Sequence, residues 1–247
     1  MKDTELEALL KRHYRGFAPT RFPGADQKRY AGLVRSTIRE ALDSNGRPVA
    51  VLDFGCGRGA VDIYDFRSEN VRVCGVDVDS SVLGNPLLDE AKLCNEALDY
   101  ADDTFDVVCS SHVFEHLDSP RESMAELYRV LKPGGKLIAL TPNCRSLPAL
   151  AARITPRRLH VWLNAKRGRA ERDTFPTVYR LNTKRAVRAA AEKVGFKIEM
   201  LEYWEGRPEY FFFTRFTFCI GLCWEKVVTS LPFLGWLRSS LFVVLSK

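Results

Sequence analysis

A strand-like apolar run that leads into a glycine-rich turn limits the fold more than any other feature of the chain. Residues 49–54 read Val-Ala-Val-Leu-Asp-Phe, and glycines follow at 55, 57 and 59. A continuous apolar strand is typical of a parallel sheet covered by helices on both faces. Glycines let the backbone turn sharply and approach a ligand closely. The pattern predicts a ligand site at the carboxyl end of the first strand of an α/β sheet.

The glycine spacing and two acids indicate which ligand this turn holds. A dinucleotide turn has the spacing G-x-G-x-x-G and rests a pyrophosphate on a helix N-terminus, whereas here the spacing is G-x-G-x-G and Asp53 precedes it. A carboxylate there suits a cationic group such as an ammonium. Asp77 ends the next predicted strand, where it can accept hydrogen bonds from both hydroxyls of a ribose. S-adenosylmethionine has a ribose and an ammonium but no phosphate.

Further motifs follow the glycine turn and Asp77 in a fixed order, at residues 103–108, 112–117, 129–135 and 141–143. With this series, residues 49–143 resemble the class I S-adenosylmethionine-dependent methyltransferases, in particular the group with type 11 and type 23 methyltransferase domains. The resemblance implies an α/β fold: a doubly wound, seven-stranded, mostly parallel sheet with helices on both faces and an antiparallel last strand.

The resemblance also implies which residues hold the cofactor. Asn95 and Glu96 lie where the family usually contacts the adenine edge, although Cys94-Asn95 stands where an aspartate is frequent. Cys56 is expected to be a small residue beside the ligand rather than a nucleophile. The cofactor-binding candidates are Asp53, Phe54, Gly55, Cys56, Gly57, Gly59, Asp77, Val78, Asn95, Glu96 and Ser111.

Ionisable side chains follow the predicted fourth strand. If the acceptor is a hydroxyl, a base must remove its proton, and histidine suits that task near neutral pH. We expect His112 and His116 to be the catalytic bases and Glu115 to orient them. The alternative is that Glu115 and His116 only brace the loop after the strand. The same residues match the zinc-hydrolase motif H-x-x-E-H, but here the motif follows a strand directly instead of lying within a helix, so no metal is expected.

Length and composition suit one methyltransferase domain over residues 1–247. The chain is 46% hydrophobic and 28% charged, which is enough for a full α/β core with extensions. Residues 1–15 show neither a secretory signal nor a membrane span, which predicts a cytoplasmic protein. Seven cysteines without C-x-x-C spacing predict reduced, mostly buried thiols. The expected parts are an N-terminal helical extension (1–47), a cofactor-binding half (48–143), a basic insertion as candidate substrate lid (144–182) and the C-terminal half of the sheet with an aromatic helix (183–247).

The insertion is rich in arginine and poor in acids. Its cations could bind a phosphate or carboxylate on an acceptor, or could form only a solvated basic face. We expect O-methylation of a small-molecule, saccharide or lipid-linked acceptor. The alternatives are an RNA methyltransferase, suggested by a pI near 9.0 but without a recognisable RNA-binding module, and a noncatalytic protein that binds S-adenosylmethionine. The substrate-binding candidates are Asn143, His160, Asp173, Tyr179 and Arg180.

An aromatic, apolar segment precedes the last predicted strand. Residues 216–224 carry no charge, and residues 231–236 read Leu-Pro-Phe-Leu-Gly-Trp. The segment is too short to span a bilayer, which needs about 20 apolar residues. We expect it to pack against the sheet between the last two strands. The alternative is a helix at a membrane surface, with Arg215, Lys226 and Arg238 nearby, which would make the protein peripheral at the inner membrane face.

Overall fold

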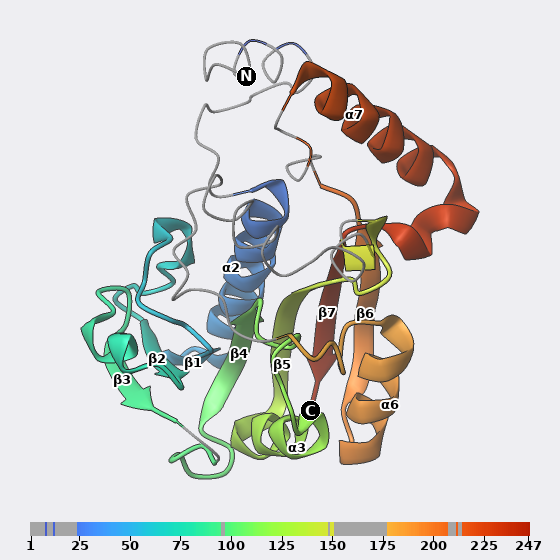
Figure 1. The fold of residues 1–247 in the computed structure, drawn as a ribbon. Coiled ribbons are helices and arrows are strands. Elements are labelled where there is room, and N and C mark those ends of the chain that lie inside the picture. Colours follow the sequence, from blue (N-terminus) through green and yellow to red (C-terminus); the bar gives the residue numbers. More distant parts are fainter. Residues whose placement is uncertain are drawn as a thin grey trace.

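One mixed sheet of seven strands organises the molecule, in the order β3-β2-β1-β4-β5-β7-β6 (Figure 1). The computed structural model describes residues 8, 12, 24–94, 97–147, 149–150, 177–206, 211 and 214–247. The strands are β1 (Val49–Phe54), β2 (Val71–Asp77), β3 (Glu90–Leu93), β4 (Phe105–Ser111), β5 (Leu131–Pro142), β6 (Lys197–Trp204) and β7 (Ser240–Ser246). β7 is antiparallel to β5 and β6, and the other pairs are parallel. The predicted fold class is confirmed.

Helices cover both faces of the sheet, which explains why residues 49–52 of β1 and 107–109 of β4 form continuous apolar runs. On one face, α2 packs Tyr30, Val34 and Ile38 against Val51 and Val107. On the other face, α3 and α6 build a second core with β4, β5 and β7. The helices are α2 (Ala25–Asn45), α3 (Pro120–Val130), α6 (Lys184–Val194) and α7 (Arg215–Ser230), and short 3-10 turns are η1 (Asp62–Tyr64), η2 (Ser80–Gly84) and η5 (Pro232–Leu237).

Local signals in the sequence set most helix ends. α2 ends at Gly46, whose φ of 58° lies in the left-handed region that glycine tolerates. The Thr183 side chain accepts a hydrogen bond from the N–H of Ala186 and caps α6. Pro120 opens α3, and the Ser119 side chain before it makes no capping hydrogen bond. Strand ends have weaker local signals. For example, β5 begins at Leu131 and continues through the Pro133-Gly134-Gly135 segment.

The aromatic segment departs from the prediction. It forms α7 and η5, and α7 lies beyond the carboxyl end of β6 rather than on a face of the sheet (Figure 1). Its main described contact is η5, which in turn touches β6. The expectation that the segment packs against the sheet is therefore wrong for α7. Among the described helices, none combines the length and apolar character that crossing a membrane requires.

All seven cysteines are free in the structure. Cys74, Cys109 and Cys144 are buried, and Cys56 and Cys94 are half-buried. Cys219 and Cys223 are exposed on α7, so the expectation of mostly buried thiols fails there.

Candidate functional site

The glycine turn follows β1 and packs against the loop that follows β4. Gly55 has a φ of 76°, and a Cβ atom on it would lie 2.2 Å from Cγ2 of Val113. Gly59 has a φ of 72°, and its Cβ would lie 2.2 Å from Oδ1 of Asn85. Any side chain at either position would collide with a neighbouring loop and force a strained backbone. Gly57 differs, because a Cβ there would meet no atom within 4 Å, so the turn borders open space at its centre.

Asp77 fastens the turn to the end of β2. Its Oδ2 accepts a hydrogen bond of 2.8 Å from the N–H of Gly57, and its Oδ1 accepts one of 2.9 Å from the N–H of Asp79. A carboxylate has about four acceptor positions, so these two bonds leave capacity for the two hydroxyls of a ribose. The next residue, Val78, is 60% exposed and offers an apolar surface beside the carboxylate.

Asp53 is a half-buried acid that has no ion-pair partner within the described part of the chain. Burial raises its pKa to about 7, the negative charge of Asp77 adds to the rise, and a hydrogen bond with Cys109 opposes it. A cationic group that entered the site would favour the ionised form. Burial and the same two carboxylates raise the pKa of the Cys56 thiol, which keeps it protonated and unsuited to nucleophilic attack.

His112 begins the loop after β4. The polar groups of Tyr64, Ser111 and His112 are connected there by consecutive hydrogen bonds. The φ of His112 is 60°, and its N–H donates to the carbonyl of Leu140 on the neighbouring strand. Its Nδ1 lies 3.0 Å from Oγ of Ser111, and that hydroxyl lies 3.1 Å from Oη of Tyr64 in η1. Tyr64 thus reaches the end of β4 from the segment after the glycine turn.

Glu115 and His116 lie deeper in the same loop. The Glu115 carboxylate is buried and accepts a hydrogen bond of 3.0 Å from Thr141, and its Oε1 lies 3.9 Å from Nε2 of His116. Asn182 donates to the Thr141 hydroxyl at 2.6 Å. The residues form a turn rather than a helix, so the two histidines are not displayed as in a zinc-hydrolase helix. Among the described residues, no group of three or more His, Cys, Asp or Glu side chains could hold a metal.

The structure brings two substrate-binding candidates to this loop. The N–H groups of Val178 and Tyr179 both donate to the carbonyl of Glu115, at 2.8 and 3.1 Å. The Arg180 guanidinium donates to the carbonyl of Asp118. Residues 177–180 therefore lie beside the loop after β4 that carries Glu115 and His116.

Other candidates lie elsewhere. Asn143 is fully buried, and its amide donates to the carbonyls of Trp236 and Arg238 at 2.8 and 2.7 Å. Its side chain is used to fasten η5 to the end of β5, which argues against the predicted substrate contact. The candidates Asn95, Glu96, His160 and Asp173, with most of the basic insertion, lie outside the described residues.

Sequence reasoning missed Tyr64, Thr141 and Asn182. Thr141 lies in the motif at residues 141–143, but only Asn143 of that motif was predicted to bind substrate. Asn182 directly precedes the N-cap of α6 and reaches Thr141 across 41 residues. Tyr64 has no local signal at all, since it lies in a short 3-10 turn whose position depends on the sheet.

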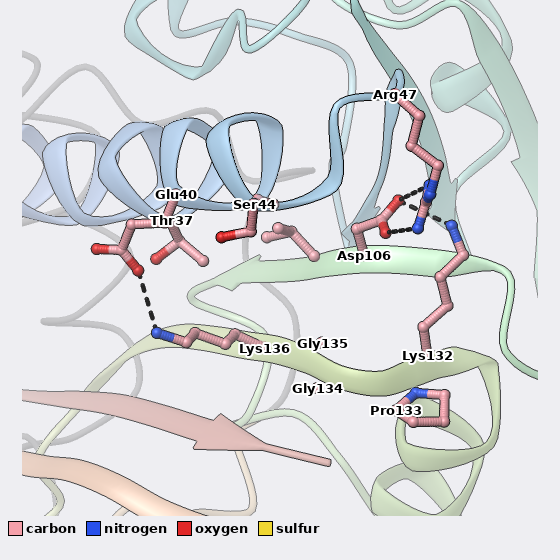
Figure 2. A pocket seen from close by; sticks show the side chains of 12 residues that line it. Thr37, Glu40, Ser44, Arg47, Asp106, Lys132, Pro133, Gly134, Gly135 and Lys136 are labelled. Carbon is pink, nitrogen blue, oxygen red and sulfur yellow. Dashed lines mark hydrogen bonds and ion pairs between the residues drawn. The ribbon is translucent and has the colours of Figure 1, made fainter.

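A separate cavity of about 270 Å³ lies at the opposite, amino-terminal edge of β4 (Figure 2). Asp106 lines it and binds Arg47 and Lys132, with oxygen–nitrogen distances of 2.6 and 2.8 Å. On the other side, Lys136 pairs with Glu40 at 3.1 Å (Figure 2). Because the charges are paired with one another and the cavity is remote from the glycine turn, we do not assign it to the cofactor.

Comparison with known proteins identifies this arrangement. A family model described as a methyltransferase domain matches residues 27–201. The chain belongs to this methyltransferase family. A solved S-adenosylmethionine-dependent methyltransferase from Archaeoglobus fulgidus has the same fold, with a TM-score of 0.54 and 18% identity over 88% of this chain and 94% of that one.

Two curated relatives differ in what they methylate. A malonyl-[acyl-carrier protein] O-methyltransferase of Enterobacter lignolyticus is 34% identical over 40% of this chain and 41% of its own length. A ubiquinone/menaquinone biosynthesis C-methyltransferase of Hydrogenovibrio crunogenus is 37% identical over 49% of this chain and 53% of its own length. The chain thus aligns with about half or less of these proteins. The family model shows that the chain has a methyltransferase domain, and the comparisons leave its acceptor open.

The residues at the glycine turn fit S-adenosylmethionine. The open space over Gly57 leaves room for a ligand between two acids. Asp77 retains acceptor capacity for a ribose, while Asp53 lacks a cationic partner among the described residues and would gain one from an ammonium group. When bound, S-adenosylmethionine supplies a methyl group on a sulfonium, which is already an activated leaving group.

Proposed function

We propose that this methyltransferase methylates an oxygen of a small-molecule, saccharide or lipid-linked acceptor, and that His112 is the base that removes the hydroxyl proton. The observation that carries the proposal is the chain from Tyr64 through Ser111 to His112. A hydroxyl needs a base as it attacks, whereas the methyl donor needs only alignment and exclusion of water.

The contact with Ser111 is compatible with either tautomer of His112, and the proposal takes the one with the proton on Nδ1. If Nδ1–H donates to Oγ of Ser111, the Nε2 lone pair is left to accept the proton of an acceptor. The Ser111 hydroxyl then donates to Oη of Tyr64, and its rotation is fixed. Burial raises the pKa of Tyr64, so the phenol stays neutral and can serve as that acceptor.

Glu115 and His116 take positioning roles in this proposal. The Glu115 carboxylate accepts from Thr141, and its carbonyl accepts from the backbone of residues 178 and 179. Together these bonds hold the acceptor-side wall against β5. The role of Tyr179 and Arg180 is to line that wall beside the methyl group.

Methyl transfer from S-adenosylmethionine with a labelled methyl group tests the proposal on a panel of hydroxylated small molecules, saccharides, lipid-linked saccharides and tRNA. We expect label in a hydroxylated acceptor, and His112→Gln should lower kcat by about 10²-fold, the lower bound for general-base catalysis. His116→Gln is the matched control, and its effect should be several-fold smaller. Label in tRNA alone, or an equal loss in both variants, would refute the proposal.

Calorimetry separates this proposal from a noncatalytic binding role. Asp77→Ala should weaken S-adenosylmethionine binding more than tenfold, because it loses the ribose contact. Tight binding of S-adenosylmethionine with no transfer to any acceptor class would favour the noncatalytic alternative.

A further inference from the structure

The outward face of α7 and η5 is an apolar stripe. Phe216, Cys219, Ile220, Cys223 and Val227 recur at spacings of three and four residues, which places them on one side of the helix. All five are exposed, and Phe216 is 74% exposed. Leu231, Phe233 and Trp236 continue the stripe past the end of the helix, where Phe233 is 70% exposed. The opposite side of α7 buries Phe218, Gly221 and Val228. We call these eight exposed residues the α7 stripe.

The α7 stripe lies at the same edge of the sheet as the methyl-transfer site. η5 leads into β7, whose first residue, Ser240, pairs with Pro142 and Trp204 at the carboxyl ends of β5 and β6. The Asn143 amide holds η5 there through the carbonyls of Trp236 and Arg238. A surface that rested on the stripe would therefore face the edge at which acceptors reach His112.

Charge indicates what the stripe binds. From residue 214 to 239, the chain has three cations, Arg215, Lys226 and Arg238, and one acid, Glu225. Arg215 and Lys226 are exposed, whereas Glu225 is half-buried. The whole chain carries a formal net charge of +6. An apolar, aromatic stripe with cations beside it complements a surface that has anionic headgroups over hydrocarbon.

A second copy of the chain complements the stripe less well. Antiparallel packing of two α7 helices would bring Arg215 of one copy toward the Lys226 end of the other, and like charges would oppose each other. A stable protein interface also uses about 20–30 residues on each side, whereas the stripe has eight.

We propose that the α7 stripe docks the methyltransferase peripherally on an anionic lipid bilayer, with α7 parallel to the surface and Phe216, Phe233 and Trp236 inserted at the headgroup level. This proposal is independent of the acceptor and of the atom that is methylated. It gives the aromatic segment a reason to leave the sheet, since its apolar side chains would be buried in lipid rather than in the core.

Flotation of the full chain with vesicles tests the docking. Vesicles of phosphatidylcholine with about a third phosphatidylglycerol should carry the protein at low salt, and binding should weaken with added salt because the cations contribute. Phe216→Ser/Phe233→Ser should reduce the fraction bound at least tenfold. Both side chains are largely exposed, so the variant should keep its fold, which circular dichroism checks. Leu83→Ser is the matched control, because Leu83 is an apolar residue 64% exposed at η2, and it should float like the parent.

The native thiols give a second readout. Cys219 and Cys223 should react rapidly with a maleimide in free protein and at least fivefold more slowly with anionic vesicles, while Cys94 keeps its rate. Failure to float at low salt would overturn the proposal, as would equal flotation of the double variant. Slow labelling without vesicles would also overturn it, because the stripe would then be covered by the chain itself or by a second copy. Since neither readout needs methyl transfer, a failure of the proposed function leaves the result interpretable.

Discussion

Two aspartates on the neighbouring strands β1 and β4 have pKa values that are shifted in opposite directions. Asp106 lies near the amino-terminal edge of β4 and binds Arg47, Lys132 and the N–H of Ala50 (Figure 2). Burial opposes its ionisation, but these hydrogen bonds outweigh burial and hold its pKa below the ordinary value. Asp53 lies at the carboxyl edge of β1, and burial raises its pKa to about 7.

The difference distinguishes an aspartate whose charge is neutralised by cations of the chain from an aspartate whose charge would be neutralised by a ligand. The partners of Asp106 come from the chain itself, so its ionised form belongs to the stable protein. Asp53 has no such cation among the described residues, and its ionisation becomes favourable only when a cationic group enters. An acid without a cation partner at the ligand edge of an α/β sheet thus indicates that the ligand carries a positive charge.

The largest effect is expected from Asp106→Asn, which should lower the free energy of unfolding by about 2–3 kcal/mol. The Asp106 carboxylate is 5% exposed, while Arg47 is 47% exposed and can regain water, so the loss stays below that of a fully buried pair. Urea denaturation measures it. Asp65→Asn is the control, because the surface pair of Asp65 and Arg67 should contribute about 0.5 kcal/mol or less. If Asp106→Asn reduced the free energy of cofactor binding by more than the free energy of unfolding, the contrast between the two aspartates would be lost.

Asp53→Asn should have the opposite signature. It should weaken S-adenosylmethionine binding about tenfold, because the neutral amide cannot pair with the ammonium. It should also raise Tm at pH 8 by roughly 2–4 °C, or about 1 kcal/mol. The native pKa exceeds the unfolded one, so the folded state holds more protons between about pH 4 and 7, and stability falls as pH rises through that window. Calorimetry and thermal melts measure both, and a lower Tm at pH 8 would contradict the assignment.

The pH dependence of binding should follow from the same acid. With a pKa of about 7 in the free protein, the ionised fraction of Asp53 rises about tenfold from pH 6 to pH 8. Affinity for S-adenosylmethionine should rise over this range by less than that factor, because the α-ammonium of the cofactor begins to lose its proton toward pH 8, and the rise should vanish in Asp53→Asn. Calorimetry in buffers of matched ionic strength tests this, and a flat profile in the parent would show that Asp53 does not sense the cofactor.

The sequence alone could indicate the cofactor half of the candidate site because that half is local. The apolar β1, the three glycines and Asp77 lie within 29 residues, and each has a role that its own φ or strand position requires. The acceptor half is built across the chain. Thr141 and Asn182 meet over 41 residues, and Glu115 reaches both Thr141 and residues 178–179. No spacing rule foretells such contacts, because the sheet decides which strand ends become neighbours.

The C-terminal segment shows the same limit for the fold. Its composition suited a buried helix, and α7 does form. However, apolar residues lie on both sides of α7, and only one side is buried. Which side meets protein depends on the direction in which the chain leaves β6 at Trp204, and hydrophobicity alone does not encode that direction. Asn143 is the reverse case. This polar residue follows β5 but is buried, and its amide donates to two carbonyls of the η5 region that would otherwise lack a donor among the described residues.

The smallest expected effect concerns Tyr64, which the sequence did not indicate. Tyr64→Phe removes the hydroxyl that holds Ser111 but keeps the ring, whose centroid lies 5.5 Å from that of Tyr30 and 6.2 Å from that of Phe66. The Ser111 hydroxyl is then free to turn and donate to Nδ1 of His112, which moves the ring proton to Nε2. We expect kcat to fall about threefold with unchanged affinity for S-adenosylmethionine.

Nitrogen-15 NMR of the His112 ring supplies the readout that mere packing would not change: the parent should have Nδ1 protonated, and Tyr64→Phe should shift the population toward Nε2. Tyr30→Phe is the matched control, because the buried Tyr30 hydroxyl has no nitrogen or oxygen partner among the described residues and lies beside the Cys109 thiol. That variant should leave both the tautomer and kcat unchanged. If the two variants behave alike, Tyr64 only fills space next to Asp53, and the polar chain to His112 has no part in preparing the base.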